Sequence, residues 1–343
     1  DRSCYFKIKI MNVSKKIFFN KNILIYGIGK SGISSYHFLK KNNHIYLYDD
    51  DQKILKKKSF KKLLLAKDQI HQIKFDYIVI SPGINFNNCK LKNKLKKKKN
   101  IIVTDLDIFY SHYSKNKIIT VTGTNGKSTT VKLLHKILKK HKKDSRLCGN
   151  IGNPILLEKN ISKKTIFVIE ASSYQIDYSN LFKSNYATIL NISPDHLERH
   201  GSMKKYVDAK FKLFKKQTKK DLAFINTKNN FLKKKLKRTK IFSKIIFVNL
   251  NIVKKLKKKI SNPYFFTFGN QENLSFIFSL AKKLKLNNNK IISEVNKFKG
   301  LKYRQEIIYK NNKFTIINDS KSTSFASSIN ILKSLKKVYW LVG

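Results

Sequence analysis

The sequence predicts an α/β protein of three domains, each built around a largely parallel sheet. With 343 residues, the chain exceeds the roughly 250 to 300 residues at which one hydrophobic core stops growing. Short β-branched runs alternate with amphipathic stretches of helical length, which is the pattern of a strand, a helix and a parallel strand. Two glycine-rich turns, over residues 27–32 and 123–126, each follow a predicted strand and open a predicted helix. Such turns are typical of open parallel sheets with an anion site at a helix N-terminus.

The first domain is predicted over residues 22–113. Residues 1–21 form an N-terminal extension and the start of this domain. The chain begins with Asp1, and Met11 precedes the first clear strand, so residues 1–10 are expected to lie outside the native start. The expected elements are strands at 22–26, 44–48 and 77–80 and a helix at 32–41.

A second α/β domain is predicted over residues 114–298, where a buried-type strand leads through the second glycine turn into a long helix. Further strands recur with helical segments between them, so the sheet is expected to be parallel. The expected elements are strands at 117–122, 165–169, 186–190, 222–225 and 245–248 and a helix at 128–140.

Residues 299–343 are predicted to begin a third domain. An α/β sheet that stops on a fresh strand is unfinished, so we expect the chain to be a fragment that ends inside this domain. The expected elements are strands at 305–309, 314–318 and 338–342 and a helix at 324–335.

The strongly basic composition is interpreted as a property of the solvated surface. The formal net charge is +54, yet only 5 of the 74 basic residues are Arg, whereas sites that grip phosphates or base edges depend on the bidentate geometry of Arg. The lysines pervade every segment, so we expect no nucleic-acid partner. The alternative, a basic nucleic-acid-binding protein, would require an affinity that collapses with salt.

Cysteine spacing and hydropathy favour a cytoplasmic protein. Cys4, Cys89 and Cys148 show neither a paired nor a metal-type spacing, which indicates free thiols in a reducing compartment. No stretch approaches the roughly 18 to 20 apolar residues needed to cross a bilayer. We expect no membrane insertion, and we expect a monomer.

The motif GIGKSG at residues 27–32 follows a strand and opens a helix, and Asp49 ends the next strand. An acid about 20 residues after such a glycine turn is part of the dinucleotide-binding fingerprint. Glycines let the backbone approach a diphosphate at the helix N-terminus. The alternatives are a tight turn without a ligand, or a nicotinamide or flavin enzyme.

The motif TGTNGKST at residues 122–129 supplies glycines, a lysine and an adjacent hydroxyl between a strand and a helix. These are the parts of a triphosphate cradle, in which Lys127 contacts the β- and γ-phosphates and Ser128 binds Mg²⁺. Val121 stands where the first glycine of GxxxxGK[ST] would fall, so the loop is a shortened variant. A diphosphate site plus a separate ATP loop favours an enzyme that uses ATP on a nucleotide-carried substrate.

The sequence around both sites resembles that of the Mur ligase family, and within this family that of the member that adds D-glutamate. The resemblance covers about residues 22–343. Folylpolyglutamate synthases share the ATP loop, but the glycine-fingerprint domain and the NDSK segment favour the Mur family. The motifs that carry it are GIGKSG, SPGI at 81–84, VTGTNGKSTT, GNIGNP at 149–154, EASSYQ at 170–175, LNISPDHLERH at 190–200, YVDAKFKLF at 206–214 and NDSKSTS at 318–324.

This resemblance implies a Rossmann-like first domain, a central P-loop ATPase domain and an incomplete Rossmann-like third domain. It also implies ATP and two Mg²⁺ ions as cofactors, with Lys127 among the catalytic residues. The implied ATP-binding residues are Gly123, Thr124, Asn125, Gly126, Lys127, Ser128, Thr129, Asn270, Arg304 and Asp319. The implied metal ligands are Ser128, Glu170, His196 and Lys210, the last as a carbamate, and all but Ser128 are also implied to be catalytic.

The implied substrate site is shared between the domains. Two positions depart from the family pattern, because Asp51 stands where a basic residue can occur and Gly269 where a histidine precedes the adenine-binding asparagine. The implied substrate-binding residues are Ile28, Gly29, Lys30, Ser31, Asp49, Gly83, Asn150, His196, Lys321 and Thr323.

The implied reaction joins D-glutamate to UDP-N-acetylmuramoyl-L-alanine through an acyl phosphate, in peptidoglycan precursor synthesis and hence in cell-wall biogenesis, cell shape and cell division. The alternative is a related ligase with a different acceptor amine. A fragment that lacks most of the third domain is expected to bind nucleotide but to ligate poorly or not at all.

Overall fold

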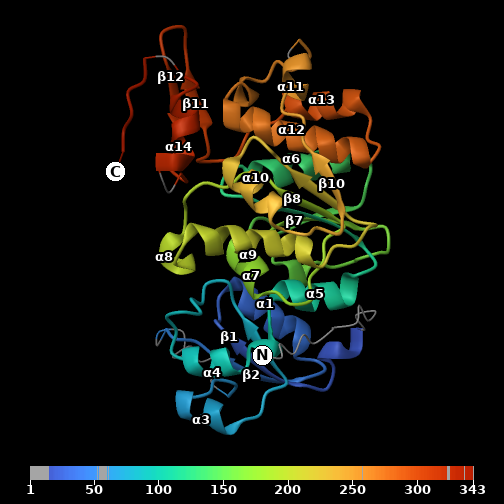
Figure 1. The fold of residues 1–343 in the computed structure, drawn as a ribbon, viewed down its shortest axis with the longest axis vertical. Helices are drawn as coiled ribbons and strands as arrows, with labels where there is room; N and C mark the ends of the chain where they lie inside the picture. The colour runs from blue at the N-terminus through green and yellow to red at the C-terminus, as the bar shows by residue number, and fades with distance from the viewer. Residues whose placement is uncertain are drawn as a thin grey trace. The chain divides into compact units, whose positions relative to one another are not determined.

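The computed structural model describes residues 15–51, 53, 60, 62–256, 258–322, 325–335 and 337–342. The chain forms two compact units. The first comprises Asp1–Lys115, Pro154–Lys159 and Tyr178–Lys183. The second comprises Asn116–Asn153, Asn160–Asp177 and Ser184–Gly343. Figure 1 shows the helices and strands of both.

The first unit is built on a four-stranded parallel sheet in the order β2-β1-β3-β4. Residues 23–26 of the central strand are all buried, as a parallel strand covered on both faces requires. The three predicted strands are confirmed without a shift, and the predicted helix lies two residues earlier. The elements are η1 (Lys15–Phe18), β1 (Asn22–Tyr26), α1 (Lys30–Leu39), β2 (His44–Tyr48), α3 (Lys67–Gln72), β3 (Tyr77–Ile80), α4 (Lys92–Lys97), η3 (Lys99–Ile101), β4 (Ile102–Val103), α5 (Asp105–Tyr113) and η4 (Ile155–Leu157).

Asp107 in α5 ties the later segment Tyr178–Lys183 into this unit. Its side chain is fully buried and accepts hydrogen bonds from the backbone N–H groups of residues 180–182 at 2.7 to 3.2 Å. It also accepts one from the N–H of Thr104 at 2.9 Å. These donors replace the water that a buried carboxylate loses.

The substitution Asp107→Asn is expected to destabilise the first unit by about 3 kcal/mol, because one acceptor becomes a donor facing N–H groups and bonds to a charged acceptor are worth about 1.5 to 3 kcal/mol. Urea unfolding measures the loss, and amide hydrogen exchange at residues 180–182 should quicken. The same change at Asp68, which is exposed in α3, should stay within about 0.5 kcal/mol. Equal losses at both positions would contradict this role of Asp107.

The second unit holds a six-stranded parallel sheet in the order β10-β9-β8-β5-β7-β6. Two of its predicted strands are confirmed without a shift and the other three differ by one residue. The elements as far as residue 296 are β5 (Lys117–Thr122), α6 (Lys127–Lys140), β6 (Ser145–Gly149), β7 (Ile166–Glu170), α7 (Ser173–Tyr178, whose last residue belongs to the first unit), β8 (Tyr186–Ile189), α8 (Leu197–His200), α9 (Met203–Lys215), β9 (Leu222–Ile225), α10 (Asn230–Lys237), β10 (Lys244–Phe247), α11 (Ile252–Lys255), η5 (Pro263–Phe265), α12 (Phe268–Lys283) and α13 (Asn288–Asn296).

Helices cover both faces of this sheet. Figure 1 shows α6 and α12 on one side and α9 on the other. Val131, Leu134 and Leu138 of α6 form one core cluster with Ile119 and Val168 of the sheet. Their spacing of three and four residues aligns them along one helix face, so α6 is fixed where it begins, at the second glycine turn.

His135 lies on α6 and is half-buried against β6. Its Nδ1 is 3.0 Å from the Oγ of Ser145. Burial and, to a smaller extent, the charges of Lys139, Arg146 and Lys132 together lower the pKa of His135 to about 4. The imidazole is therefore neutral in the folded protein near pH 7.

The contribution of His135 to the free energy of unfolding is expected to decrease as the pH drops from about 6.5 to about 4. The unfolded chain has the higher histidine pKa and takes up the proton first, so the neutral form stabilises the fold fully only above the unfolded pKa. The variant His135→Gln should lose this part of the pH dependence, as thermal melts at pH 7 and pH 5 would measure. The variant His71→Gln, at an exposed position, serves as the control. A slope that His135→Gln leaves unchanged would contradict the assignment.

The part of the second unit after Gly300 carries an antiparallel pair of strands and a helix. The predicted strand at 338–342 is wrong: these residues are exposed and pair with no described strand. An extended segment needs a neighbour to satisfy its N–H and C=O groups as a ladder. The elements are β11 (Glu306–Lys310), β12 (Thr315–Asn318) and α14 (Phe325–Leu332).

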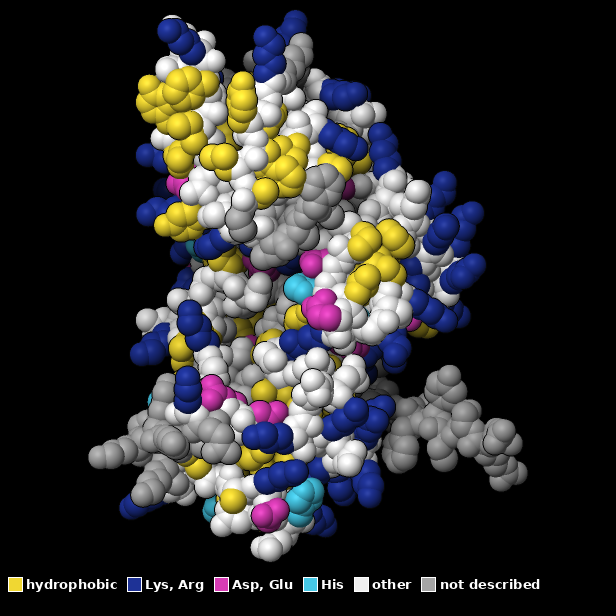
Figure 2. Space-filling model, turned by 90° about the vertical axis from the view of Figure 1, so that its left-hand side faces the viewer, with side chains coloured by type: hydrophobic (Ala, Val, Ile, Leu, Met, Phe, Trp, Pro, Cys, Tyr) yellow, Lys and Arg dark blue, Asp and Glu magenta, His cyan; other side chains and the backbone are white. Residues whose placement is uncertain are grey.

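Apolar side chains gather on the β11–β12 hairpin, in the upper part of the face shown in Figure 2. Ile307, Ile308, Tyr309, Phe314 and Ile316 are between 39% and 57% exposed. Clustering of this kind differs from the scattered single apolar residues of an ordinary surface.

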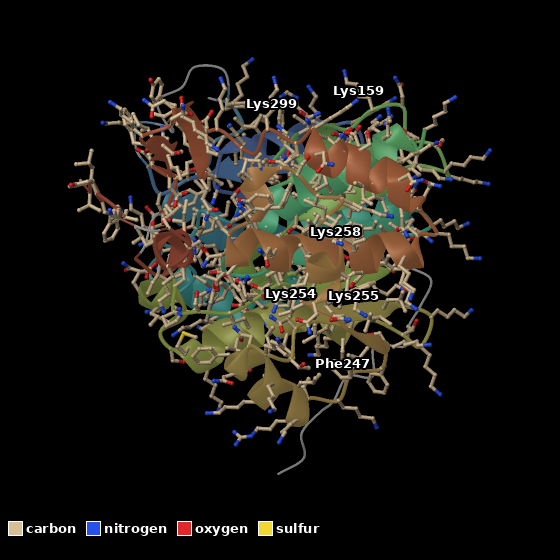
Figure 3. All side chains as sticks on the ribbon, turned by 90° about the horizontal axis from the view of Figure 1, so that it is seen from above. Lys159, Phe247, Lys254, Lys255, Lys258 and Lys299 are labelled. Carbon is tan, nitrogen blue, oxygen red and sulfur yellow. The ribbon has the colours of Figure 1, made fainter. Side chains whose placement is uncertain are left out.

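Lysine side chains point outward around both units (Figures 2 and 3). The labelled Lys159, Lys254, Lys255, Lys258 and Lys299 are all exposed. The positive charge is therefore largely hydrated at the surface. Within the described part of the chain, every helix falls short of the length and hydrophobicity that a bilayer-spanning segment needs.

Candidate active site

The phosphate loop of the second unit connects β5 to α6. Gly126 caps the helix with φ at +83°, and a Cβ there would lie 1.9 Å from Oδ1 of Asn273. Only glycine fits this position, because the left-handed backbone and the missing space both exclude a side chain. The first N–H groups of α6, beginning at Lys127, have no acceptor within the helix. The turn therefore presents N–H donors and the positive end of a helix dipole, as an anion site requires.

Lys127 is folded back over this loop. Its Nζ donates to the carbonyl oxygens of Gly123 at 3.0 Å and Thr124 at 2.6 Å. Burial lowers the pKa of Lys127, while the charge of Glu170 raises it and that of Arg304 lowers it. The side chain needs only to exchange carbonyl oxygens for phosphate oxygens to bind a nucleotide.

Glu170 ends β7, the strand that pairs with β5 so that Glu170 lies opposite Val121. Its side chain is 1% exposed. Oε1 accepts a hydrogen bond from Nδ2 of Asn150 at 3.1 Å, but Oε2 is buried without a partner. A buried carboxylate oxygen without a partner is the donor that a hard cation prefers, so this position fits Mg²⁺.

Lys210 on α9 is buried beside the same loop. Its Nζ donates to the carbonyl oxygen of Gly123 at 2.9 Å. Burial, followed by the charge of Lys127, holds the pKa of Lys210 well below its ordinary value. A neutral amine can react with CO₂ to form a carbamate, and the amine itself offers no anionic oxygen to a metal.

His196 stands at the start of α8 with a left-handed backbone, φ 53°. Its imidazole lies 3.5 Å from the carboxylate of Asp195 and 3.8 Å from that of Glu198. The side chain is 45% exposed and can reach solvent. No three His, Cys, Asp or Glu side chains of the described residues meet as a ready-made metal site. The predicted ligand set therefore depends on the Ser128 hydroxyl and on a modified Lys210.

A pocket opens beside the phosphate loop. Half of its lining consists of predicted ATP-binding residues: Asn125, Gly126, Ser128, Thr129, Asn270, Arg304 and Asp319. The other half was not predicted: Asn191, Tyr264, Gly269, Glu272, Asn273, Gln305 and Ser322.

Asn270 and Asn273 line the pocket with different roles: the side chain of Asn270 is fully hydrogen-bonded, and that of Asn273 has an unpartnered acceptor. Nδ2 of Asn270 donates to the carbonyl oxygen of Tyr264 at 2.8 Å and to Oε1 of Gln305 at 2.9 Å. Its Oδ1 accepts from Nδ2 of Asn273 at 3.3 Å. Oδ1 of Asn273 is buried without a partner, so Asn273 offers the available acceptor. The signal in the sequence was its position three residues after Asn270 on one helix, which places both on the same face.

Arg304 and Asp319 close the pocket from the segment around β11 and β12. Oδ1 of Asp319 accepts from the N–H of Gln305 at 3.1 Å, and Oδ2 is buried without a partner. Burial raises the pKa of Asp319, whereas the charge of Arg304 lowers it. Nζ of Lys321 lies 5.5 Å from the ring centre of Tyr303. The predicted Thr323 lies outside the described residues.

The glycine turn of the first unit is held by Asp49. One carboxylate oxygen accepts from the N–H of Ile28 at 2.6 Å and the other from the N–H of Asp51 at 3.0 Å. A Cβ at Gly32 would lie 1.9 Å from the carbonyl oxygen of Gly27. Asp49 therefore holds the backbone of the turn, a role that the sequence analysis did not predict. Its contact with the substrate stays a prediction.

Open space surrounds two of the predicted substrate-binding glycines. A Cβ on Gly29 or Gly83 would meet no atom within 4 Å. Lys30 is exposed, and the hydroxyl of Ser31 donates to Asp105 at 2.9 Å. A ligand can therefore approach the backbone of this turn closely.

Comparison with known proteins shows the family to which the chain belongs. The family model described as the Mur ligase middle domain matches residues 121–299. The UDP-N-acetylmuramoylalanine--D-glutamate ligase of Rickettsia prowazekii is 32% identical over 354 residues, covering 97% of this chain and 78% of that protein. The ligase of the same name from Elusimicrobium minutum is 36% identical over 353 residues, covering 95% and 78%.

Solved structures share the fold at low sequence identity. UDP-N-acetylmuramate:L-alanyl-gamma-D-glutamyl-meso-diaminopimelate ligase from Neisseria meningitides has a TM-score of 0.54 and 14% identity, covering 82% of this chain and 99% of that chain. UDP-N-acetylmuramate-alanine ligase from Thermotoga maritima has a TM-score of 0.51 and 17% identity, covering 92% and 77%.

Proposed function

Because the chain belongs to the Mur ligase family, we propose that it joins D-glutamate to UDP-N-acetylmuramoyl-L-alanine as ATP is converted to ADP and phosphate. Membership of the family makes it an ATP-dependent ligase. The choice of D-glutamate is supported by the relatives at 32% and 36% identity, which carry that activity in their names. The product would be a precursor of peptidoglycan.

One observation carries the nucleotide part of this proposal. The end of β5 opens into a loop whose position 126 accepts only glycine, and the adjacent strand β7 ends in a buried carboxylate oxygen without a partner. A phosphate cradle beside a cation-binding oxygen is what Mg²⁺ and ATP together require.

The donors present fit the metal ions that the family implies. Ser128 and Glu170 would hold one Mg²⁺, and His196 with carbamylated Lys210 would hold a second. When bound, these ions would stabilise the negative charge on the phosphoryl group in transfer.

In the proposed first step, an oxygen of the alanyl carboxylate attacks the γ-phosphorus of ATP. The new O–P bond forms as the bond to the β–γ bridging oxygen breaks, and ADP leaves. Lys127 contributes by placing its ammonium against the phosphoryl oxygens, since positioned charge is the main source of rate in such transfers. In the second step the amine of D-glutamate attacks the acyl carbon, phosphate leaves, and the amine loses a proton to give the amide.

The first unit is proposed to bind the UDP end of the substrate. Open space at Gly29 and Gly83 supports a diphosphate against the turn of residues 28–31, with Asp49 near the ribose. The remaining proposed substrate contacts are Asn150, His196, Lys321 and Thr323.

Release of ADP with different acceptor amines tests the proposal. With UDP-N-acetylmuramoyl-L-alanine present, D-glutamate should stimulate ADP release more than L-glutamate or L-lysine does, and mass spectrometry should identify the amide. A rate that is low with every amine, together with normal binding of ATP, would instead agree with the expected poor ligation by this chain. Stimulation by an L-amino acid alone would assign the chain to a related ligase. Failure to bind ATP, together with salt-sensitive binding of DNA, would refute the ligase function itself.

A further inference from the structure

Asn191 holds the phosphate loop from the neighbouring strand. It lies two residues after the end of β8, which pairs with β5. Its Oδ1 accepts from the backbone N–H of Asn125 at 2.9 Å, and its Nδ2 donates to the carbonyl oxygen of Asn125 at 3.3 Å. One side-chain amide thus bonds both backbone groups of a loop residue, much as a neighbouring strand would.

The orientation of the Asn191 amide is fixed by its surroundings. A backbone N–H can only donate, so the oxygen of Asn191 must face Asn125. The amide nitrogen then faces Glu272, whose Oε2 accepts from it at 3.4 Å. Oε1 of Glu272 accepts from Nδ2 of Asn226, and Oδ1 of Asn226 accepts from the N–H of Lys228 at 2.8 Å. Each side chain in this series of hydrogen bonds therefore has only one possible arrangement of donor and acceptor.

Glu272 stands in an unfavourable place for a residue that would touch a triphosphate. The residue is 8% exposed and lines the pocket beside the loop, where a negative charge repels phosphates. A buried carboxylate persists only when it is well hydrogen-bonded. Here the carboxylate accepts from the amides of Asn191 and Asn226, so its evident function is to orient them.

We propose that Asn191 and Glu272 are positioning residues that hold the phosphate loop in its nucleotide-binding shape before ATP arrives. Glu272 orients the amide of Asn191, and Asn191 fixes both backbone groups of Asn125. The N–H groups at the start of α6 are then directed at the phosphates without further ordering, which would otherwise weaken binding. This inference rests on the proposed role of the loop in binding ATP.

A pair of substitutions tests the bond by reversing its direction. In Asn191→Asp, two carboxylates face each other. In Glu272→Gln, an amide nitrogen must face either Asn191 or Asn226, which are both donors. In the double variant N191D/E272Q, the amide introduced at position 272 can donate to the carboxylate introduced at position 191 and still accept from Asn226. That carboxylate still accepts from the N–H of Asn125.

Calorimetric titration with Mg·ADP supplies the first measurement. Each single variant is expected to bind about 10-fold more weakly or worse, since bonds to charged groups are worth about 1.5 to 3 kcal/mol. The double variant should recover in part, to within about fivefold of the wild type. The bonds to the N–H of Asn125 and between positions 191 and 272 are restored, but a carboxylate oxygen replaces the donor that faced the carbonyl oxygen of Asn125 at 3.3 Å. Weak binding by the double variant, or normal binding by either single variant, would overturn the proposal.

Amide hydrogen exchange at Asn125 in the nucleotide-free protein supplies a second measurement that does not depend on ATP. Protection should fall in both single variants, because repulsion between the two carboxylates, or between two donors, displaces the side chain at position 191 from the N–H of Asn125. Protection should return in the double variant. If the wild-type protein binds no nucleotide but this pattern appears, the proposed ligase function is wrong, whereas the positioning role of Asn191 and Glu272 is supported. If the wild-type protein binds nucleotide normally and the pattern is absent, only the positioning role is wrong.

The chain offers a matched control at the other end of the same sheet. Oδ1 of Asn185 accepts from the N–H of Ile118 at 2.8 Å, and its Nδ2 donates to Asp221 at 3.4 Å. Asn185→Asp therefore creates the same clash of carboxylates away from the loop. It should lower the melting temperature and leave the affinity for Mg·ADP within about twofold. An equal loss of affinity would show that the effect is one of general stability, which would overturn the proposal.

Discussion

ATP turnover is expected to fall by about 10³-fold when Lys127 is replaced by methionine, because a positioned charge on the transferring phosphoryl group is worth that much in comparable enzymes. Methionine keeps an unbranched apolar stem and removes only the ammonium group. The bonds from Nζ to Gly123 and Thr124 show that this group already lies against the loop. Release of ADP in the presence of both substrates measures the effect.

Folding should tolerate this change. Burial lowers the pKa of Lys127, which means that the charged form is held in the fold against a desolvation penalty. The melting temperature of Lys127→Met is therefore expected to stay near that of the wild type. Lys140→Met, at an exposed position on the same helix, should leave both turnover and melting unchanged. Turnover by Lys127→Met within tenfold of the wild type would contradict the assignment of the loop.

The substitution Glu170→Gln is expected to lower turnover by about 10²- to 10³-fold, the usual cost of removing one positioned electrostatic group from a reaction centre. Glutamine keeps the bond from Asn150 but replaces a free carboxylate oxygen with a neutral amide. A neutral amide is a weaker ligand for Mg²⁺. Turnover should therefore require a higher Mg²⁺ concentration for half-maximal rate.

The melting temperature of Glu170→Gln distinguishes a metal ligand from a residue with a purely structural role. Oε2 of Glu170 is buried without a partner, and such an oxygen costs free energy in the fold. Glu170→Gln should therefore melt at the same temperature as the wild type or higher, although turnover collapses. The control Glu294→Gln, on α13, should affect neither property. Parallel losses of turnover and stability in Glu170→Gln would refute the metal-ligand assignment.

The local sequence pattern was sufficient to predict most strands of the two parallel sheets. The strands at 22–26 and 117–122 are runs buried on both faces, bounded by polar residues and glycine turns, and both appear where they were predicted. The glycine turns were predictable for the same reason. A left-handed or crowded backbone position, such as Gly126, accepts only glycine, and this requirement is written in the sequence itself.

Residues that act through long-range contact were not predictable. Asn191 and Glu272 are 81 residues apart. Asn191 lies in the family motif at 190–200, but nothing in the sequence pairs it with Glu272 or with the phosphate loop. Asparagine and glutamate are ordinary surface residues in a lysine-rich chain, so only their burial beside the loop distinguishes them. The family motifs identified Lys210 among many lysines, and its burial at 2% exposure gives that choice a physical basis that composition could not.

The wrong strand at 338–342 has a different cause. Its apolar and β-branched residues match the propensity of a strand, but propensity in a sheet expresses packing against a neighbour. No described strand pairs with this segment. The hydrogen-bonding partner, rather than the local sequence, decides the outcome.

The first unit borrows two segments from beyond residue 150, and this affects how the chain can fold during synthesis. The carboxylate of Asp107 accepts a hydrogen bond from the backbone N–H of Asn180, 73 residues further along the chain. When residue 115 leaves the ribosome, this unit is still incomplete, and it stays so while β5 and α6 of the second unit emerge. The first unit can therefore be completed only after residue 183 has been synthesised, which departs from the usual domain-by-domain order. A polypeptide cut after residue 115 would lose the three backbone N–H groups of residues 180–182 that donate to this carboxylate.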